Sequence, residues 1–146
     1  MRLAWATDIH LNFVTTPARR RFLESVQEHA DALVVTGDIA ESNSLGATLM
    51  VMDALVGRPV YFVLGNHDFY RGDVAGTRSA VAEMIDGSPK MVYLSQAGVV
   101  ELTPNTALVG HDGWADGRLM PQPVSGLYDG MNTTWPSLSV SVRKSS

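Results

Sequence analysis

The stretch VYFVLGNHD, residues 60–68, joins an apolar run to a compact group of polar side chains. Its first five residues are apolar, β-branched or aromatic, which predicts a strand over 60–64 that is buried on both faces. Asn66, His67 and Asp68 follow almost directly and supply an amide, an imidazole and a carboxylate. The stretch therefore predicts a buried strand whose end carries groups suited to binding and catalysis.

Two earlier apolar runs end in the same kind of chemistry. RLAWAT predicts a strand over 2–7, and Asp8 and His10 follow it. ALVVT predicts a second strand over 32–36, and Asp38 comes just after it. Each of these strand ends could be an ordinary polar turn when taken alone. Because all three strongest strands end in this way, a shared site is the better interpretation.

Helical patterns separate the predicted strands. Apolar residues four positions apart predict one buried stripe on the first helix, and His29 on that helix is predicted to be a surface residue. Strands that alternate with helices indicate an α/β fold with a mainly parallel sheet, right-handed crossovers and cover on both faces. The predicted helices span 17–30 (with its stripe at Ala18, Phe22, Val26 and Ala30), 44–56 and 73–86, and shorter strands are predicted over 91–94, 98–102 and 106–110.

The carboxyl ends of parallel strands meet at one edge of a sheet, where ligands bind. This places four oxygen and nitrogen donors together, and the chain has no cysteine to add a thiolate. Such a set suits divalent Mn, Fe, Zn or Mg, and His67 beside Asp68 suits an oriented acid. We therefore predict a metal site formed by Asp8, His10, Asp38 and Asn66.

Composition narrows the class of protein. A formal net charge of −4 over 146 residues argues against a nucleic-acid partner. An acidic residue at position 8 comes too early for the apolar segment of a signal peptide. No run approaches the roughly 20 apolar residues of a membrane span. These features predict a cytoplasmic protein with no membrane contact.

The three strand ends together resemble the signature of the calcineurin-like metallophosphoesterase family. The matching segments are DIH (8–10), GDIAE (37–41) and GNHD (65–68). The resemblance covers residues 1–118, and GHDGWADGR (110–118) is similar to a segment of some bacterial members. It implies a β-sandwich flanked by helices on both sides.

The resemblance also implies roles for the site residues. Asp8, His10 and Asp38 would hold one divalent metal, and Asp38 would bridge to a second metal that also binds Asn66. A metal-bound hydroxide would hydrolyse a phosphomonoester or phosphodiester substrate. His67, paired with Asp68, would assist the leaving oxygen.

The second half of the family pattern has no counterpart here. The family completes its site with a further histidine and a G-H-x-H pair, whereas this chain has only His10, His29, His67 and His111. His111 has Gly113 two residues later, so the metal role of the pair is not transferred to it.

The tail over 119–146 shows no helical period and only a weak strand pattern over 138–142. We therefore expect a domain that is incomplete at its C-terminus, as a truncated or frame-shifted product would be. Two alternatives to an active phosphoesterase stay open. One is a non-catalytic remnant that binds at most one metal, and the other is a half-site completed by a second chain in an oligomer.

Overall fold

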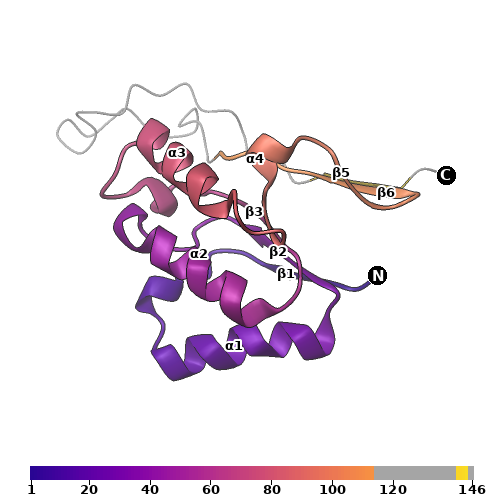
Figure 1. Cartoon of the computed structure of the whole chain (residues 1–146), viewed down its shortest axis with the longest axis horizontal. Coiled ribbons are helices and arrows are strands. Elements are labelled where there is room, and N and C mark those ends of the chain that lie inside the picture. Colours follow the sequence, from indigo (N-terminus) through magenta and orange to yellow (C-terminus); the bar gives the residue numbers. More distant parts are fainter. Residues whose placement is uncertain (114–140, 145–146) are drawn as a thin grey trace, which may run out of the picture.

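A parallel sheet forms the centre of the molecule in a computed structural model, which describes residues 1–113 and 141–144. Its four strands lie side by side in chain order and run in the same direction (Figure 1). β2 and β3 are buried along almost their whole length, as the uncharged apolar runs predicted. The strands are β1 (Leu3–Ala6), β2 (Ala32–Thr36), β3 (Val60–Val63) and β4 (Met91–Tyr93).

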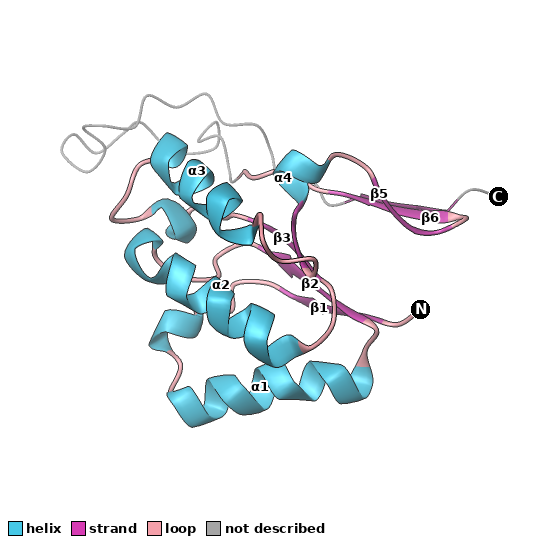
Figure 2. Ribbon diagram, viewed as in Figure 1, coloured by secondary structure: helices cyan, strands magenta, loops and turns pink. Residues whose placement is uncertain are grey.

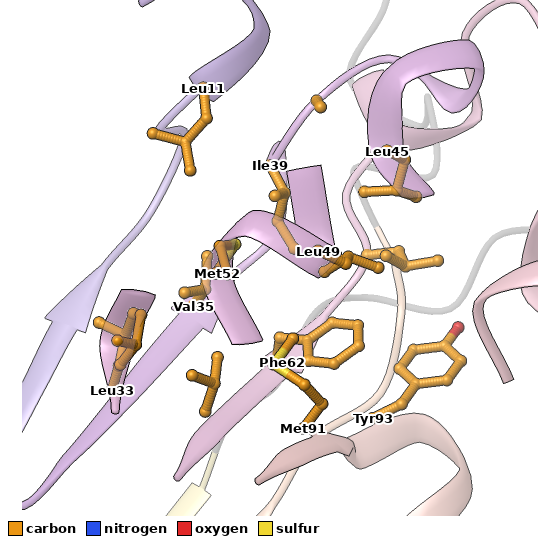
Figure 3. Packing of buried hydrophobic residues seen from close by; sticks show 14 of the residues in the cluster. Leu11, Leu33, Val35, Ile39, Leu45, Leu49, Met52, Phe62, Met91 and Tyr93 are labelled. Carbon is orange, nitrogen blue, oxygen red and sulfur yellow. The ribbon is translucent and has the colours of Figure 1, made fainter. Parts of the chain in front are cut away.

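The three long helices cover one and the same face of this sheet. They are α1 (Thr16–His29), α2 (Ser42–Val56) and α3 (Val74–Ile85). Right-handed crossovers between strands that follow each other in order always step in the same direction, so the connecting helices stay on one side. Residues from all three helices and from alternate positions of β2 and β3 form a single core cluster. Figure 3 shows Leu49 and Met52 of α2 in this cluster, packed with Val35 and Phe62 of the sheet.

A smaller antiparallel sheet and a short helix cover the opposite face at β2 and β3 (Figure 2), whereas Trp5 of β1 on that face is 73% exposed. Val34 and Val63 point to this side, where they pack with Leu94 and Leu108 in a second core cluster. The two sheets thus form a sandwich, and the α/β prediction with a parallel sheet flanked by helices is confirmed. Helices on the outer side of the smaller sheet, which the resemblance implied, are not among the described residues. These elements are α4 (Leu94–Ala97), β5 (Val100–Thr103), β6 (Thr106–Val109) and β7 (Ser141–Lys144).

The helices begin and end close to their predicted bounds, with one wrong detail in α1. We expected Phe22 in its buried stripe, but Phe22 is 37% exposed and Leu23 is fully buried instead. Steps of four residues overrun the 3.6-residue turn by about 40° each, so such a stripe drifts off the buried face. Gly57 ends α2 with a left-handed φ of 63°, a conformation in which glycine commonly ends helices.

Three short elements have no counterpart in the sequence prediction. Besides α4, they are the single 3₁₀ turns η1 (Leu11–Phe13) and η2 (His67–Phe69). The predicted strand over 138–142 lies partly outside the described residues, and β7 begins at Ser141. Among the described residues, no helix is both long enough and apolar enough to cross a membrane.

Candidate metal centre

The loops that follow β1, β2 and β3 meet at the carboxyl edge of the parallel sheet. The backbone amide of Asp8 donates to Gly37 O (3.2 Å), and that of His10 donates to Asp38 O (3.0 Å). The His67 amide donates to Oδ1 of Asp38 at 3.0 Å. These bonds join the three loops in pairs, so the predicted convergence of the three strand ends is what the structure shows.

Three side chains in these loops lie close enough to share one metal ion. One ligand atom each from His10, Asp38 and His67 can be chosen so that all lie within 4.8 Å of one another. Nε2 of His10 is 3.9 Å from Oδ2 of Asp38, and the two imidazole rings are 4.8 Å apart between centroids. Asp38 is buried, whereas both histidines are half-buried. A carboxylate with two imidazoles suits Zn, Mn or Fe and fits the donor chemistry expected of this site.

Asp8 does not belong to this group. It is exposed, and its carboxylate accepts a hydrogen bond from the hydroxyl of the preceding Thr7 at 2.5 Å. The sequence placed Asp8 correctly at the strand end but could not show where its carboxylate points. Its role as a metal ligand stays a prediction.

Asn66 is held by a neighbouring tyrosine. Its Nδ2 donates to the hydroxyl of Tyr70 at 3.1 Å, and the Tyr70 ring lies 4.4 Å from the ring of His67. With Nδ2 committed to Tyr70, Oδ1 is the atom that Asn66 could offer to a metal. The metal role of Asn66 therefore stays a prediction, and Tyr70 is a contact that the motif did not indicate.

Asp68 faces the protein backbone rather than an imidazole. Its Oδ1 accepts from the amides of Ile39 (2.8 Å) and Ala40 (2.9 Å), and its Oδ2 accepts from that of Gly65 (2.8 Å). The residue is fully buried, and this burial raises the pKa of its carboxyl to about 7. The hydrogen bonds that the structure gives Asp68 thus tie the loop after β3 to the loop after β2. The expected pairing with His67 is not seen among them, and a catalytic role for either residue stays a prediction.

The backbone of three predicted ligands is left-handed. Asp8, His10 and Asp38 have φ values of 52°, 38° and 52°. This conformation costs a non-glycine residue about 1–2 kcal/mol, and such strain is concentrated at functional sites. The strain supports the assignment of these loops to a site independently of the side chains.

Two glycines allow the loops after β2 and β3 to touch. A Cβ added to Gly37 would lie 2.7 Å from Gly65 N, and one added to Gly65 would lie 2.7 Å from Asp38 N. Gly37 also has a φ of 92°, which favours glycine. The close approach at these glycines is therefore between the two loops themselves.

Residues after β6 complete the surroundings of the β3 end, and the sequence motifs missed them. Asp112 is almost fully buried and binds the backbone amide of Leu64 at 2.8 Å. The neighbouring His111 is exposed, and its Nδ1 lies 2.5 Å from the backbone oxygen of Asp112. Among the described residues, His111 is not in the metal-capable group. Asp112 lies in the segment 110–118 that is similar to some family members, but nothing in that segment indicated that its carboxylate would be buried.

Comparison with known proteins agrees with this geometry. The family model described as calcineurin-like phosphoesterase matches residues 1–136, and so extends past Arg118, where we placed the end of the resemblance. Searches of curated proteins and of solved structures gave no match. The family match spans most of the 146 residues and includes all three strand-end motifs. The chain belongs to the calcineurin-like phosphoesterase family.

Proposed function

We propose that this protein is a metal-dependent phosphoesterase that hydrolyses phosphomonoester or phosphodiester bonds at the carboxyl edge of its parallel sheet. The observation that carries the proposal is the grouping of His10, Asp38 and His67 within 4.8 Å in a chain of this family. A divalent metal in this group would supply the Lewis-acid charge that polarises a phosphoryl oxygen. The metal could be Mn, Fe, Zn or Mg, since the donor set accepts each of them.

The chain's own residues have separable tasks in this proposal. His10 and Asp38 hold the metal, with Asp8 and Asn66 as further candidate ligands. His67 gives a proton from its ring to the leaving oxygen. The hydrogen bond from its backbone amide to Asp38 keeps the ring beside the metal-binding carboxylate. Asp68 fixes the loop that carries His67 through its bonds to backbone amides. A cytoplasmic location goes with this proposal.

The test combines metal content, hydrolysis and one isosteric variant. The protein is loaded with Mn²⁺ and dialysed, and bound ions are counted by elemental analysis. Hydrolysis is then followed with p-nitrophenyl phosphate as the monoester and bis(p-nitrophenyl) phosphate as the diester. Asp38→Asn keeps the shape of the side chain but removes its charge. Loss of a residue that only hydrogen-bonds to a metal ligand lowers metal affinity roughly 10–100-fold, and loss of the ligand's charge should lower it by more. Asp86→Asn is the matched control, because Asp86 is exposed and lies in no site loop.

The outcomes distinguish the proposed phosphoesterase from its alternatives. Mn-dependent hydrolysis that is lost in Asp38→Asn and kept in Asp86→Asn supports the proposal. Failure of the wild-type protein to bind Mn²⁺ contradicts it. Hydrolysis whose specific activity rises with protein concentration identifies the half-site completed by a second chain, which a size measurement would check.

The second candidate is the non-catalytic remnant that binds at most one metal. Within the described part of the chain, the group has three side chains, which is enough for one ion but not for two. Binding of one Mn²⁺ per chain without hydrolysis of either ester would support that alternative.

A further inference from the structure

Asp112 is the centre of a buried polar network at the end of β3. Its carboxylate is completely buried and accepts hydrogen bonds from Ser95 Oγ (2.7 Å), Arg78 Nε (2.9 Å) and the Tyr93 hydroxyl. Its own amide donates to Ser95 Oγ at 2.7 Å. These partners come from α3, β4 and α4, so one carboxylate joins three elements. Replacing a buried ion pair by apolar residues is often neutral or stabilising, so the Arg78–Asp112 pair is weak evidence that the network stabilises the fold. In some other proteins, buried polar groups instead select one structural arrangement over others.

The network reaches the candidate metal centre through the backbone of β3. The last residue pair that joins β3 to β4 is Phe62 with Tyr93, so Leu64 lies beyond the ladder between these strands. The amide of Leu64 donates instead to Oδ1 of Asp112 at 2.8 Å. Asn66 and His67 follow two and three residues later. Asp112 thus fixes the backbone at Leu64, just before these two residues of the candidate centre.

A second route leads from Asp112 to the other end of the same loop. Arg78, which bonds to Oδ2 of Asp112, places its guanidinium 5.8 Å from the centroid of the Phe69 ring. Phe69 ends the 3₁₀ turn that His67 begins. The loop from Leu64 to Phe69 is therefore bounded at both ends by groups that Asp112 binds. A cation over an aromatic ring is attracted to the ring face, so this contact helps to hold the turn that Phe69 ends.

We propose that Asp112 is a positioning residue for the candidate metal centre, because its buried carboxylate fixes the loop that presents Asn66 and His67. The inference rests on the proposed function, because a positioning role has a purpose only at a working metal centre. One of its two tests, the His67 spectrum of the metal-free protein, does not depend on that function. Asp112 touches neither metal nor substrate and acts only through the β3 end and Arg78. It gives the described residues after β6 (110–113) a role in the site, although none of them belongs to the group of side chains that could hold a metal.

The test compares Mn²⁺ affinity and histidine spectra of the full chain. Asp112→Asn leaves an oxygen for Leu64 but turns an amide group toward Arg78, and Ser95→Ala is the milder variant that removes one partner of Asp112. Val56→Ala is the control, because it truncates a buried core residue at the far end of α2, near the amino end of β3. Affinity is measured by electron paramagnetic resonance of free Mn²⁺ at a temperature where every variant is folded. Spectra are taken of ¹³C-histidine-labelled, metal-free protein, with His29 on α1 as the internal reference.

We expect Asp112→Asn to lower Mn²⁺ affinity about tenfold, at the lower end of the loss seen for outer partners of ligands. Ser95→Ala should lower it less, and Val56→Ala should leave it unchanged although it also destabilises the fold. The His67 ring signal should move in both network variants and stay in place in the control, while the His29 signal stays in all of them.

Unchanged affinity in Asp112→Asn and Ser95→Ala would overturn the inference, as would an equal loss in Val56→Ala. If the wild-type protein binds no Mn²⁺, the proposed function fails and the His67 signal alone decides. A shift in the network variants then still supports the positioning role, and an unmoved signal overturns it. If Asp112→Asn does not fold, Ser95→Ala decides by the same two measurements.

Discussion

Gly65→Ala tests whether the contact between the loops after β2 and β3 builds the candidate centre. A Cβ at residue 65 would lie 2.7 Å from the backbone nitrogen of Asp38 and even closer to its carboxylate. Real Cβ atoms almost never approach another atom within 3.0 Å, so one loop must move. The carboxylate could swing away, but the backbone nitrogen could not move without its strand. The φ of Gly65 is not among the positive values, so the added strain is steric rather than conformational.

The expected magnitude follows from two opposing effects. Overpacking of a tight contact costs about 1–3 kcal/mol, whereas an alanine in place of glycine gains about 0.4–1 kcal/mol from the unfolded chain. The clash is the larger effect, so the free energy of unfolding should fall by about 1–2 kcal/mol. Because Asp38 must turn away from its place beside His10 and His67, Mn²⁺ affinity should fall as well.

Gly87→Ala is the matched control for this prediction. A Cβ at residue 87 would meet no atom within 4 Å, and its φ is not in the left-handed region. It should leave Mn²⁺ affinity unchanged and raise stability by up to about 1 kcal/mol. Urea unfolding and Mn²⁺ titration of both variants give the answer. A Gly65→Ala protein as stable as Gly87→Ala and with wild-type affinity would refute the geometry on which the candidate centre rests.

Two further predictions concern the fold around the centre. Burial, together with the hydrogen bond to Asp112, raises the pKa of the Tyr93 hydroxyl above its ordinary value of about 10. The folded protein then keeps this proton where the unfolded chain loses it, so the stability that Tyr93 contributes is present below about pH 10 and lost as pH rises further. Tyr93→Phe should therefore cost about 1–2 kcal/mol at pH 7, and the gap to wild type should narrow above pH 10 in urea unfolding; a constant gap would contradict this. Leu49→Ala, at a 1% exposed position between α2 and the sheet, should cost about 2–5 kcal/mol in the same assay, and a loss below 1 kcal/mol would show that the core there is not packed as described.

The sequence indicated the parallel sheet and the meeting of three strand ends for a clear physical reason. Uncharged runs such as Ala32–Thr36 are stable only when both faces are covered, and helical segments between them leave room for little except parallel strands. Once the strands are parallel, geometry brings their carboxyl ends to one edge. The side of the sheet on which the helices lie was harder to predict from the sequence. It depends on the order of the strands in the sheet, which no local pattern encodes.

The orientation of side chains within the loops could not be predicted. Asp8, Asp38 and Asp68 all follow strands, yet one is exposed, one lies in the metal-capable group and one binds backbone amides. Left-handed backbone at Asp8 and Asp38 affects where their side chains point, and aspartate adopts such φ values only occasionally, so the sequence did not indicate them. The bond from Asp112 to Leu64 joins residues 48 positions apart, and a buried aspartate is seldom expected before its partners are known.

The backbone amides of the loop after β3 show how this site differs from one that cradles phosphate directly. The amides of Leu64, Gly65 and His67 each donate to a carboxylate, from Asp112, Asp68 and Asp38. In phosphate-binding loops, successive free amides of this kind face the anion. Three carboxylates occupy them here, so these amides are not available to a substrate phosphate. The same bonds hold Asn66 and His67 in place, since charge-assisted hydrogen bonds are about twice as strong as neutral ones. The loop therefore uses its amides to fix Asn66 and His67, and in the proposed function the positive charge that attracts a phosphate ester would come from the metal.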